Sequence, residues 1–339
     1  MYPFLFQPNL HPVVWGGNRL APWKGLSVDN PENIGESWEV SAVASSPSVI
    51  ANGEHKGRVL TDVISEHPEE ILGKTVARQY NNKLPLLVKF IDAKSDLSIQ
   101  VHPDDEMAQR EHGKMGKSEM WYILDAKPGA YIYAGFKDHL TDDEYKRKVA
   151  DGTITDALAR HEVKTGDVFY MPAGRVHAIC GGILLAEVQQ SSDVTYRIFD
   201  YNRAGLDGKP RELHTQLAAQ ALDFNVYDEY RTLYPKDMER ANRCISSPFF
   251  NVRMVDISSM FHRNLKKYDS FIISMCIKGS CCLVIRDNGY AITLHEGHSC
   301  LIPACIADYD VIPLNGEKVQ LLDAFINNKS PNPFKVIFG

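Results

Sequence analysis

The stretch SIQVHPDDEMAQREHGKMGKSEMWYIL, residues 98–124, places Gln100 and His102 two positions apart in a strand-like segment. A charged segment follows it and leads to Lys117, Glu119 and more strand-like sequence. Side chains two residues apart in a β-strand point to the same face. We therefore expect Gln100 and His102 to project together into the space that the sheet encloses, where they can share one ion.

A second stretch, GDVFYMPAGRVH at residues 166–177, brings His177 after a turn. Two imidazoles, the Glu119 carboxylate and an amide oxygen make a mixed nitrogen and oxygen site, suited to zinc or another divalent first-row metal. Water or substrate would complete the coordination, which is typical of a catalytic site. Taken singly, His102 or His177 is more often a surface residue or a packed core residue, and only their pattern favours metal binding.

The second stretch has a weak copy further along the chain. Residues 297–308, GHSCLIPACIAD, keep the spacing from Gly to Pro found in residues 166–177. Cys305 stands in place of the second Gly, and Asp308 stands in place of the histidine. The copy therefore predicts a second, degenerate unit without metal ligands.

Most of the remaining sequence is typical of a mainly β protein, a barrel or sandwich with helical inserts. Strand-like segments are short, rich in β-branched or aromatic residues and bounded by turn residues: 84–93, 97–103, 120–126, 130–136, 166–172 and 182–190. Helical patterns cover 58–72, 141–160 and 210–222. Thr141 and Glu144 fit a capping box, and Pro210 fits the first turn of a helix. The charged segment 104–114 is expected to be a solvated loop, and a domain boundary is expected near residues 228–245.

Composition excludes several classes of partner. The 339 residues carry a net charge of -6, which provides no basic stripe for a nucleic acid. No run of about 18 apolar residues occurs, and the N-terminus lacks a basic leader with a cleavage site, so neither a membrane span nor a signal peptide is expected. Seven cysteines without CxxC spacing favour a reducing compartment, the cytoplasm.

The motifs resemble those of a known family. GDVFYMPAGRVH resembles the second cupin motif, and SIQVHP followed by a Glu resembles the first, with Gln in place of its first histidine. LPLLVKFIDAKSDLSIQVHPDD (84–105) resembles the zinc-site segment of type I mannose-6-phosphate isomerases. VVWGGNRL (13–20), GESWEVSA (35–42), QQSSDVTYRIFDYNR (189–203) and GKPRELH (208–214) resemble other segments of that family.

The resemblance implies two cupin (jelly-roll) barrels. Residues 1–235 would form a catalytic cupin domain with helical inserts, and 236–339 a degenerate cupin-like domain. It implies one zinc ion bound by Gln100, His102, Glu119 and His177, with Arg197 and Lys117 as catalytic groups. The short spacing from His102 to Glu119 resembles the short bacterial branch of the family.

The implied substrates are mannose 6-phosphate and fructose 6-phosphate. Their interconversion moves a proton between C1 and C2 through an enediolate, and a metal and cationic side chains can stabilise its negative charge. Lys89, in an apolar strand, is expected to face the cavity and the phosphate, with Glu187 and Asp193 also in the substrate site. The base stays open among Lys117, a zinc-bound hydroxide, Glu187 and Asp193.

Two other functions stay open at this point. One is a different metal-dependent cupin enzyme, such as an iron-dependent oxygenase, which would lack the phosphate-binding cations. The other is a non-catalytic sugar-phosphate-binding cupin. The sequence also leaves open whether the chain is a monomer or a homodimer.

Overall fold

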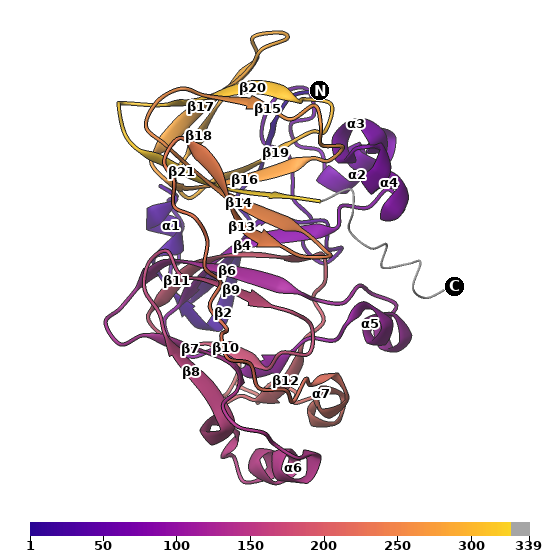
Figure 1. Cartoon of the computed structure of the whole chain (residues 1–339), viewed down its shortest axis with the longest axis vertical. Coiled ribbons are helices and arrows are strands. Elements are labelled where there is room, and N and C mark those ends of the chain that lie inside the picture. Colours follow the sequence, from indigo (N-terminus) through magenta and orange to yellow (C-terminus); the bar gives the residue numbers. More distant parts are fainter. Residues whose placement is uncertain (327–339) are drawn as a thin grey trace. The chain divides into compact units, whose positions relative to one another are not determined.

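The computed structural model describes residues 1–326, and most of its regular structure is β-sheet (Figure 1). The strands are β1 (Phe4–Leu5), β2 (Leu10–Gly17), β3 (Ile34–Val40), β4 (Leu86–Ala93), β5 (Ile99–Val101), β6 (Glu119–Ala126), β7 (Tyr131–Phe136), β8 (Leu158–Glu162), β9 (Val168–Met171), β10 (His177–Ile179), β11 (Ile183–Gln190), β12 (Tyr196–Phe199), β13 (Arg240–Ser246), β14 (Asn251–Ile257), β15 (Phe261–Asn264), β16 (Ile272–Lys278), β17 (Ser280–Ile285), β18 (Ala291–His295), β19 (Ser299–Ile302), β20 (Asp308–Pro313) and β21 (Val319–Phe325). The helices are α1 (Leu20–Trp23), α2 (Leu60–Glu66), α3 (Pro68–Leu72), α4 (Lys74–Gln79), α5 (Asp105–His112), α6 (Asp142–Ala150), α7 (Thr215–Ala221) and the short 3-10 helix η1 (Ile154–Ala157).

The chain forms two compact units. The central unit contains residues 10–37 and 89–232, and the terminal unit contains residues 1–9, 38–88 and the chain from 233 onward. The two units are thus not two consecutive halves of the sequence, because the segments before β2 and between residues 38 and 88 cluster with the C-terminal strands.

The central unit is built on two antiparallel sheets. Their strand orders are β2-β3-β4-β11-β6-β9 and β12-β5-β10-β7-β8, and most of their residues belong to this unit. Inward-facing side chains of both sheets, such as Trp121 of β6 and Ile132 of β7, form one hydrophobic cluster. A second cluster joins β5 and β12 to α6 and α7, with Tyr145 and Ala218 fully buried in it. This arrangement is the jelly-roll barrel with helical inserts expected from the motifs.

The terminal unit repeats the two-sheet arrangement. Its sheets have the orders β1-β19-β16-β21-β14-β13 and β15-β20-β17-β18. Alternate residues along these strands, including Cys276, Leu321 and Val311, are buried in a common cluster, as the two-residue period of a strand requires. Helices α2, α3 and α4 follow one another in this unit and lie together in Figure 1.

The six predicted strand segments are confirmed as β4, β5, β6, β7, β9 and β11. The predicted helix over 58–72 forms as α2 and α3, which meet at His67 because Pro68 begins the second helix. Thr141 and Glu144 form the predicted capping box of α6.

Three local predictions were wrong. Helix α6 ends at Ala150 rather than near residue 160, because Gly152 adopts a positive φ of 70° and the chain turns into η1 and β8. Helix α7 begins at Thr215, and Pro210 instead forms an isolated β-bridge with Ala204. The charged segment 104–114 is not simply a loop: residues 105–112 form α5, whose first turn is capped by the Asp104 side chain.

The degenerate repeat is confirmed, but its inward-facing residue is not the one that the spacing indicated. Tyr309, not Asp308, belongs to the buried cluster of the terminal unit. Tyr309 pairs with Arg263 across β20 and β15, just as His177 pairs with Gln100 across β10 and β5. Tyr309 follows Pro303 by six residues, whereas His177 follows Pro172 by five. The terminal unit therefore has one extra residue before this position. Asp308 lies beside His262 and Lys266, partly exposed to solvent.

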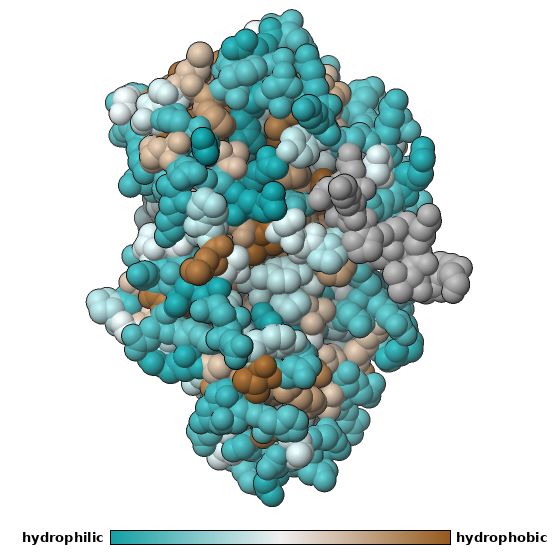
Figure 2. All heavy atoms as spheres, viewed as in Figure 1, coloured by the Kyte–Doolittle hydropathy of each residue, from teal (hydrophilic) through white to brown (hydrophobic). Residues whose placement is uncertain are grey.

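No helix within residues 1–326 is both long enough and apolar enough to span a bilayer. The face drawn in Figure 2 is mainly hydrophilic, with apolar residues in small separate areas. Scattered exposed apolar side chains of this kind are normal on a protein surface.

Candidate metal centre and active site

The four predicted metal ligands lie together inside the central unit. His102, Glu119 and His177 are almost completely buried, and their ligand atoms all lie within 4.8 Å of one another. Nε2 of His102 is 3.4 Å from Oε2 of Glu119, and Nε2 of His177 is 3.2 Å from Oε1. The Gln100 amide lies 3.4 Å from Nε2 of His177. Residues separated by up to 77 positions in sequence thus meet at one point.

Strand pairing and one turn hold these side chains in place. His177 is directly opposite Gln100 because β10 pairs with β5, and Glu119 opens β6 opposite Met171 of β9. The turn before His177 contains Gly174, whose φ is +88°. The Gly174 amide donates to the carbonyl oxygen of His102 at 2.9 Å, so the turn is tied to the neighbouring ligand.

Hydrogen bonds to the backbone fix the tautomer of both histidines. Nδ1 of His102 lies 2.9 Å from the carbonyl oxygen of Val194, and Nδ1 of His177 lies 2.8 Å from that of Arg175. A carbonyl oxygen can only accept, so each Nδ1 carries a proton and donates it. Each Nε2 therefore presents its lone pair to the centre, the arrangement that metal-binding histidines need.

The donors fit a divalent cation. Neither oxygen of Glu119 receives a hydrogen bond of good geometry from the described residues, although Lys117 Nζ lies 2.7 Å from Oε2. Buried acceptors of this kind are costly unless a cation satisfies them. The amide of Gln100 can present its oxygen to the centre by rotating half a turn. Two imidazoles, one carboxylate and one amide form a site for a first-row divalent metal.

Lys117 lies against this centre and is not a solvated loop residue. Its side chain is only 7% exposed, and Nζ is 3.0 Å from Nε2 of His102. Burial, followed by repulsion from Lys117, lowers the pKa of His102 to about 3. Burial opposes ionisation of Glu119, but Lys117 and the two histidines outweigh it and hold the pKa of this carboxyl well below its usual range. The centre therefore keeps a carboxylate and neutral imidazoles near neutral pH.

A cavity of about 160 Å³ adjoins the ligands. Apolar and charged side chains both line it. They come from β2 to β5, the segment before β6, β10 to β12 and the chain after β12: Val13, Trp15, Glu36, Lys89, Ile91, Leu97, Ser98, Gln100, Lys117, Ile179, Glu187, Thr195, Arg197 and Arg211. A few convergent polar groups on a mainly rigid scaffold are typical of a site for a small polar molecule.

The predicted cavity residues Lys89 and Glu187 face each other in it. Lys89 Nζ lies 3.6 Å from Glu36 and 3.5 Å from Glu187. Trp121 donates from Nε1 to Oε2 of Glu187 at 3.0 Å. Burial, and then the nearby charge of Glu119, raises the pKa of Glu187. The cavity thus holds a carboxylate that can accept a proton.

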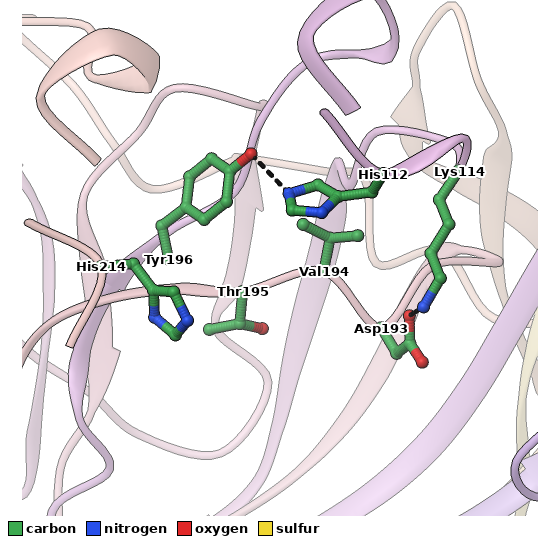
Figure 3. Close-up of a pocket in the computed structure, with 7 residues that line it drawn as sticks. All are labelled: His112, Lys114, Asp193, Val194, Thr195, Tyr196 and His214. Carbon is green, nitrogen blue, oxygen red and sulfur yellow. Dashed lines mark hydrogen bonds and ion pairs between the residues drawn. The ribbon is translucent and has the colours of Figure 1, made fainter. Parts of the chain in front are cut away.

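The other two predicted residues lie on either side of Thr195. Arg197 lines the cavity beside Gln100, with which it pairs across β12 and β5. Asp193 does not line this cavity; its Oδ1 accepts from Lys114 at 2.6 Å in a neighbouring, more open pocket of about 300 Å³ (Figure 3). In that pocket His112 approaches the Tyr196 hydroxyl at 2.8 Å, and His214 lies nearby. Thr195 lines both pockets.

Three cavity contacts were not predicted. Glu36 pairs with Lys89, Trp121 donates to Glu187, and Arg211 lines the cavity. Glu36 and Arg211 do lie in the GESWEVSA and GKPRELH segments, which carry the family resemblance. That resemblance was the one available signal, because neither residue has a fixed spacing from the metal ligands.

The histidines of the centre make the stability of the metal-free protein depend on pH. An unfolded histidine has a pKa near 6.5, against about 3 for His102 in the folded chain. Because the folded pKa is the lower one, the unfolded state takes up the proton first, and stability present above pH 6.5 is lost on acidification towards pH 3. Between pH 6.5 and 5, His102 should account for a loss of about 1.6 kcal/mol.

Denaturant unfolding of the metal-free protein at these two pH values tests this expectation. The His102→Gln variant should lose about 1.6 kcal/mol less than the wild type over the same interval. Equal losses in the two proteins would show that His102 is not the group responsible.

Two cupin barrels, one with a buried His/Glu/His cluster that could hold a metal ion beside a charged cavity, define a cupin enzyme for a small polar substrate. Residues 4–136 match the phosphomannose isomerase type I catalytic domain, and residues 241–317 match the mannose-6-phosphate isomerase cupin domain. Mannose-6-phosphate isomerase ManA of Bacillus subtilis is 34% identical over 91% of this chain and 95% of its own length. A mannose-6-phosphate isomerase of Streptococcus mutans is 33% identical over 91% and 94%.

A solved structure agrees with these sequence relatives. The crystal structure of a mannose 6-phosphate isomerase from Bacillus subtilis superimposes with a TM-score of 0.85 at 32% identity, covering 96% of this chain and all of that one. The chain belongs to the type I phosphomannose isomerase family, and its reaction class is aldose–ketose isomerisation.

Proposed function

We propose that the chain interconverts mannose 6-phosphate and fructose 6-phosphate through an enediolate, with one zinc ion held by Gln100, His102, Glu119 and His177. The observation that carries the proposal is the pair of Nε2 lone pairs directed at the buried Glu119 carboxylate. This donor set suits zinc. When bound, zinc supplies a Lewis acid that polarises a substrate oxygen.

The side chains of the cavity have separate roles in this proposal. Lys117, buried beside the ligands, donates to a substrate oxygen that gains negative charge, and Arg197 binds the substrate as a second cation. Glu187 is the carboxylate that takes the proton from carbon, since its pKa is raised and it lines the cavity, whereas Asp193 pairs with Lys114 outside it. Lys89 holds Glu187 and Glu36 in place.

The zinc requirement can be tested by metal removal. Chelator-treated protein should convert mannose 6-phosphate to fructose 6-phosphate at least about 100-fold more slowly, limited by contaminating metal, and zinc should restore the rate. His177→Ala with zinc present should stay inactive, while His139→Ala, at an exposed position, should behave as wild type.

The alternatives predict different results in the same assay. Restoration by iron but not by zinc would favour a different metal-dependent cupin enzyme. A folded, zinc-loaded protein that binds sugar phosphate without turnover would favour the non-catalytic sugar-phosphate-binding cupin. A site that no longer has a function would tolerate losses like those in the terminal barrel. The central barrel keeps all four candidate ligands, which supports a functional site there.

We also propose a cytoplasmic location. All seven cysteines are free thiols in the structure, and five of them are buried. In an oxidising compartment, a protein with this many cysteines usually forms disulfide bonds.

A further inference from the structure

Three arginines surround one aspartate at the edge of the substrate cavity. Asp200 accepts two hydrogen bonds from Arg211, at 2.7 Å from Nε and 2.6 Å from Nη2. It also accepts one from Nε of Arg203 at 3.0 Å. Arg211 lines the cavity, whereas Arg203 does not and turns Nη1 to the carbonyl oxygen of Asp96. Asp200 is buried, so this carboxylate fixes the position of both guanidinium groups.

Arg197 completes the group but has no carboxylate of its own. Its Nη1 donates to the carbonyl oxygen of Glu212 at 2.8 Å, and its Nε is buried without a hydrogen-bond partner among the described residues. Burial, and then repulsion from Arg211, lowers the pKa of Arg197. Arg197 is half-buried, and this unpaired buried donor can take up an anion.

The remaining cations of the cavity are already paired. Lys89 lies between Glu36 and Glu187, and Lys117 lies against Glu119. Around Asp200, three guanidinium groups lie near a single buried carboxylate, and Glu212, which also acts on Arg197, is largely exposed. Among the cations that line the cavity, Arg197 and Arg211 therefore carry the positive charge that is least compensated by carboxylates.

We propose that Arg211 is a second phosphate-binding residue beside Arg197, and that Asp200 is the positioning residue that holds it there. This inference rests on the proposed function and deepens it. Asp200 takes up Nε and Nη2 of Arg211, which leaves Nη1 outside the pair, and a phosphate dianion can bridge Arg211 and the unpaired edge of Arg197. The substrate then lies with its phosphate at the arginines and its reacting carbons at Lys117 and the metal ligands.

A matched pair of variants separates phosphate binding from a structural role. Arg211→Gln and Arg203→Gln each remove an arginine from Asp200, but only Arg211 lines the cavity. For Arg211→Gln, the KM for mannose 6-phosphate and the inhibition constant of inorganic phosphate should both rise about tenfold or more, with kcat within about threefold of wild type. Arg203→Gln should change neither constant by more than about twofold. Thermal unfolding of both variants shows whether each is folded.

Direct titration with inorganic phosphate keeps this test independent of turnover. An Arg211-dependent phosphate affinity in a wild-type protein without isomerase activity would leave the phosphate site standing and reject the proposed function. In an active enzyme, an unchanged phosphate affinity of folded Arg211→Gln would reject the phosphate site alone. Equal losses in Arg211→Gln and Arg203→Gln would also reject it, because they would indicate a merely structural cluster around Asp200.

Discussion

The Glu119→Gln variant is expected to lose at least about 1000-fold in kcat/KM for the isomerisation, together with most of its bound metal. Glutamine keeps the shape of the side chain but removes the one negative charge among the predicted ligands. Glu119 is completely buried, with its oxygens 3.2 and 3.4 Å from the two histidines. A neutral amide leaves a divalent cation without compensation in this dry environment, so metal affinity should fall with the rate.

Two measurements separate the causes of this loss. The metal content per chain, measured after dialysis against a metal-free buffer, reports on the centre, and thermal unfolding reports on the fold, since Lys117 also loses its carboxylate partner. Glu106→Gln, an exposed glutamate on α5, is the control and should retain both metal and activity. A Glu119→Gln protein with full metal content and near wild-type kcat/KM would remove Glu119 from the ligand set.

The clustering of the candidate metal ligands could be predicted because these residues follow local rules. Gln100 and His102 share a face by the two-residue period of a strand, and their neighbours are supplied by short motifs with fixed spacing. The structure brings Glu119 and His177 to the same point through β-pairing. The central barrel, with its six predicted strands, follows from the same alternation of side chains.

The contacts that could not be predicted depend on tertiary structure. Glu36 and Arg211 reach the cavity from segments whose distance from the metal ligands varies with the loops between them. The length of α6 was overestimated because apolar residues continue with a helical spacing past Gly152, where the backbone leaves the helix. Charge dominates residues 105–112 and predicts a loop, yet Met107 and Ala108 bury one face of α5.

The terminal barrel shows why spacing alone can misplace a residue by one position. Such a shift moves every side chain of a strand to the opposite face of the sheet. Once Tyr309 is aligned with His177, Arg263 takes the position of Gln100. Ser274 of β16 pairs with Asp323 of β21, just as Trp121 of β6 pairs with Glu187 of β11. Ser274 therefore corresponds to Trp121, and Asp323 corresponds to Glu187.

At the place of the candidate metal centre, this barrel therefore contains an internal ion pair. Arg263 Nη2 lies 2.6 Å from Oδ2 of Asp323, and the two side chains are only 5% and 3% exposed. Ser274 donates to Oδ1 of the same aspartate at 2.8 Å, as Trp121 donates to Glu187 in the other barrel. The positive charge inside the terminal barrel is thus supplied by a side chain, the guanidinium group of Arg263.

Replacing Arg263 by leucine should destabilise the protein by about 3–5 kcal/mol, because it leaves the buried Asp323 carboxylate with a single serine donor. The free energy of unfolding in denaturant measures the loss. The double variant Arg263→Leu/Asp323→Leu should recover most of it, since neither charge then remains buried. Arg286→Leu, which breaks the exposed pair with Asp310, should leave stability nearly unchanged. A double variant no more stable than Arg263→Leu would instead assign the loss to packing around the arginine side chain.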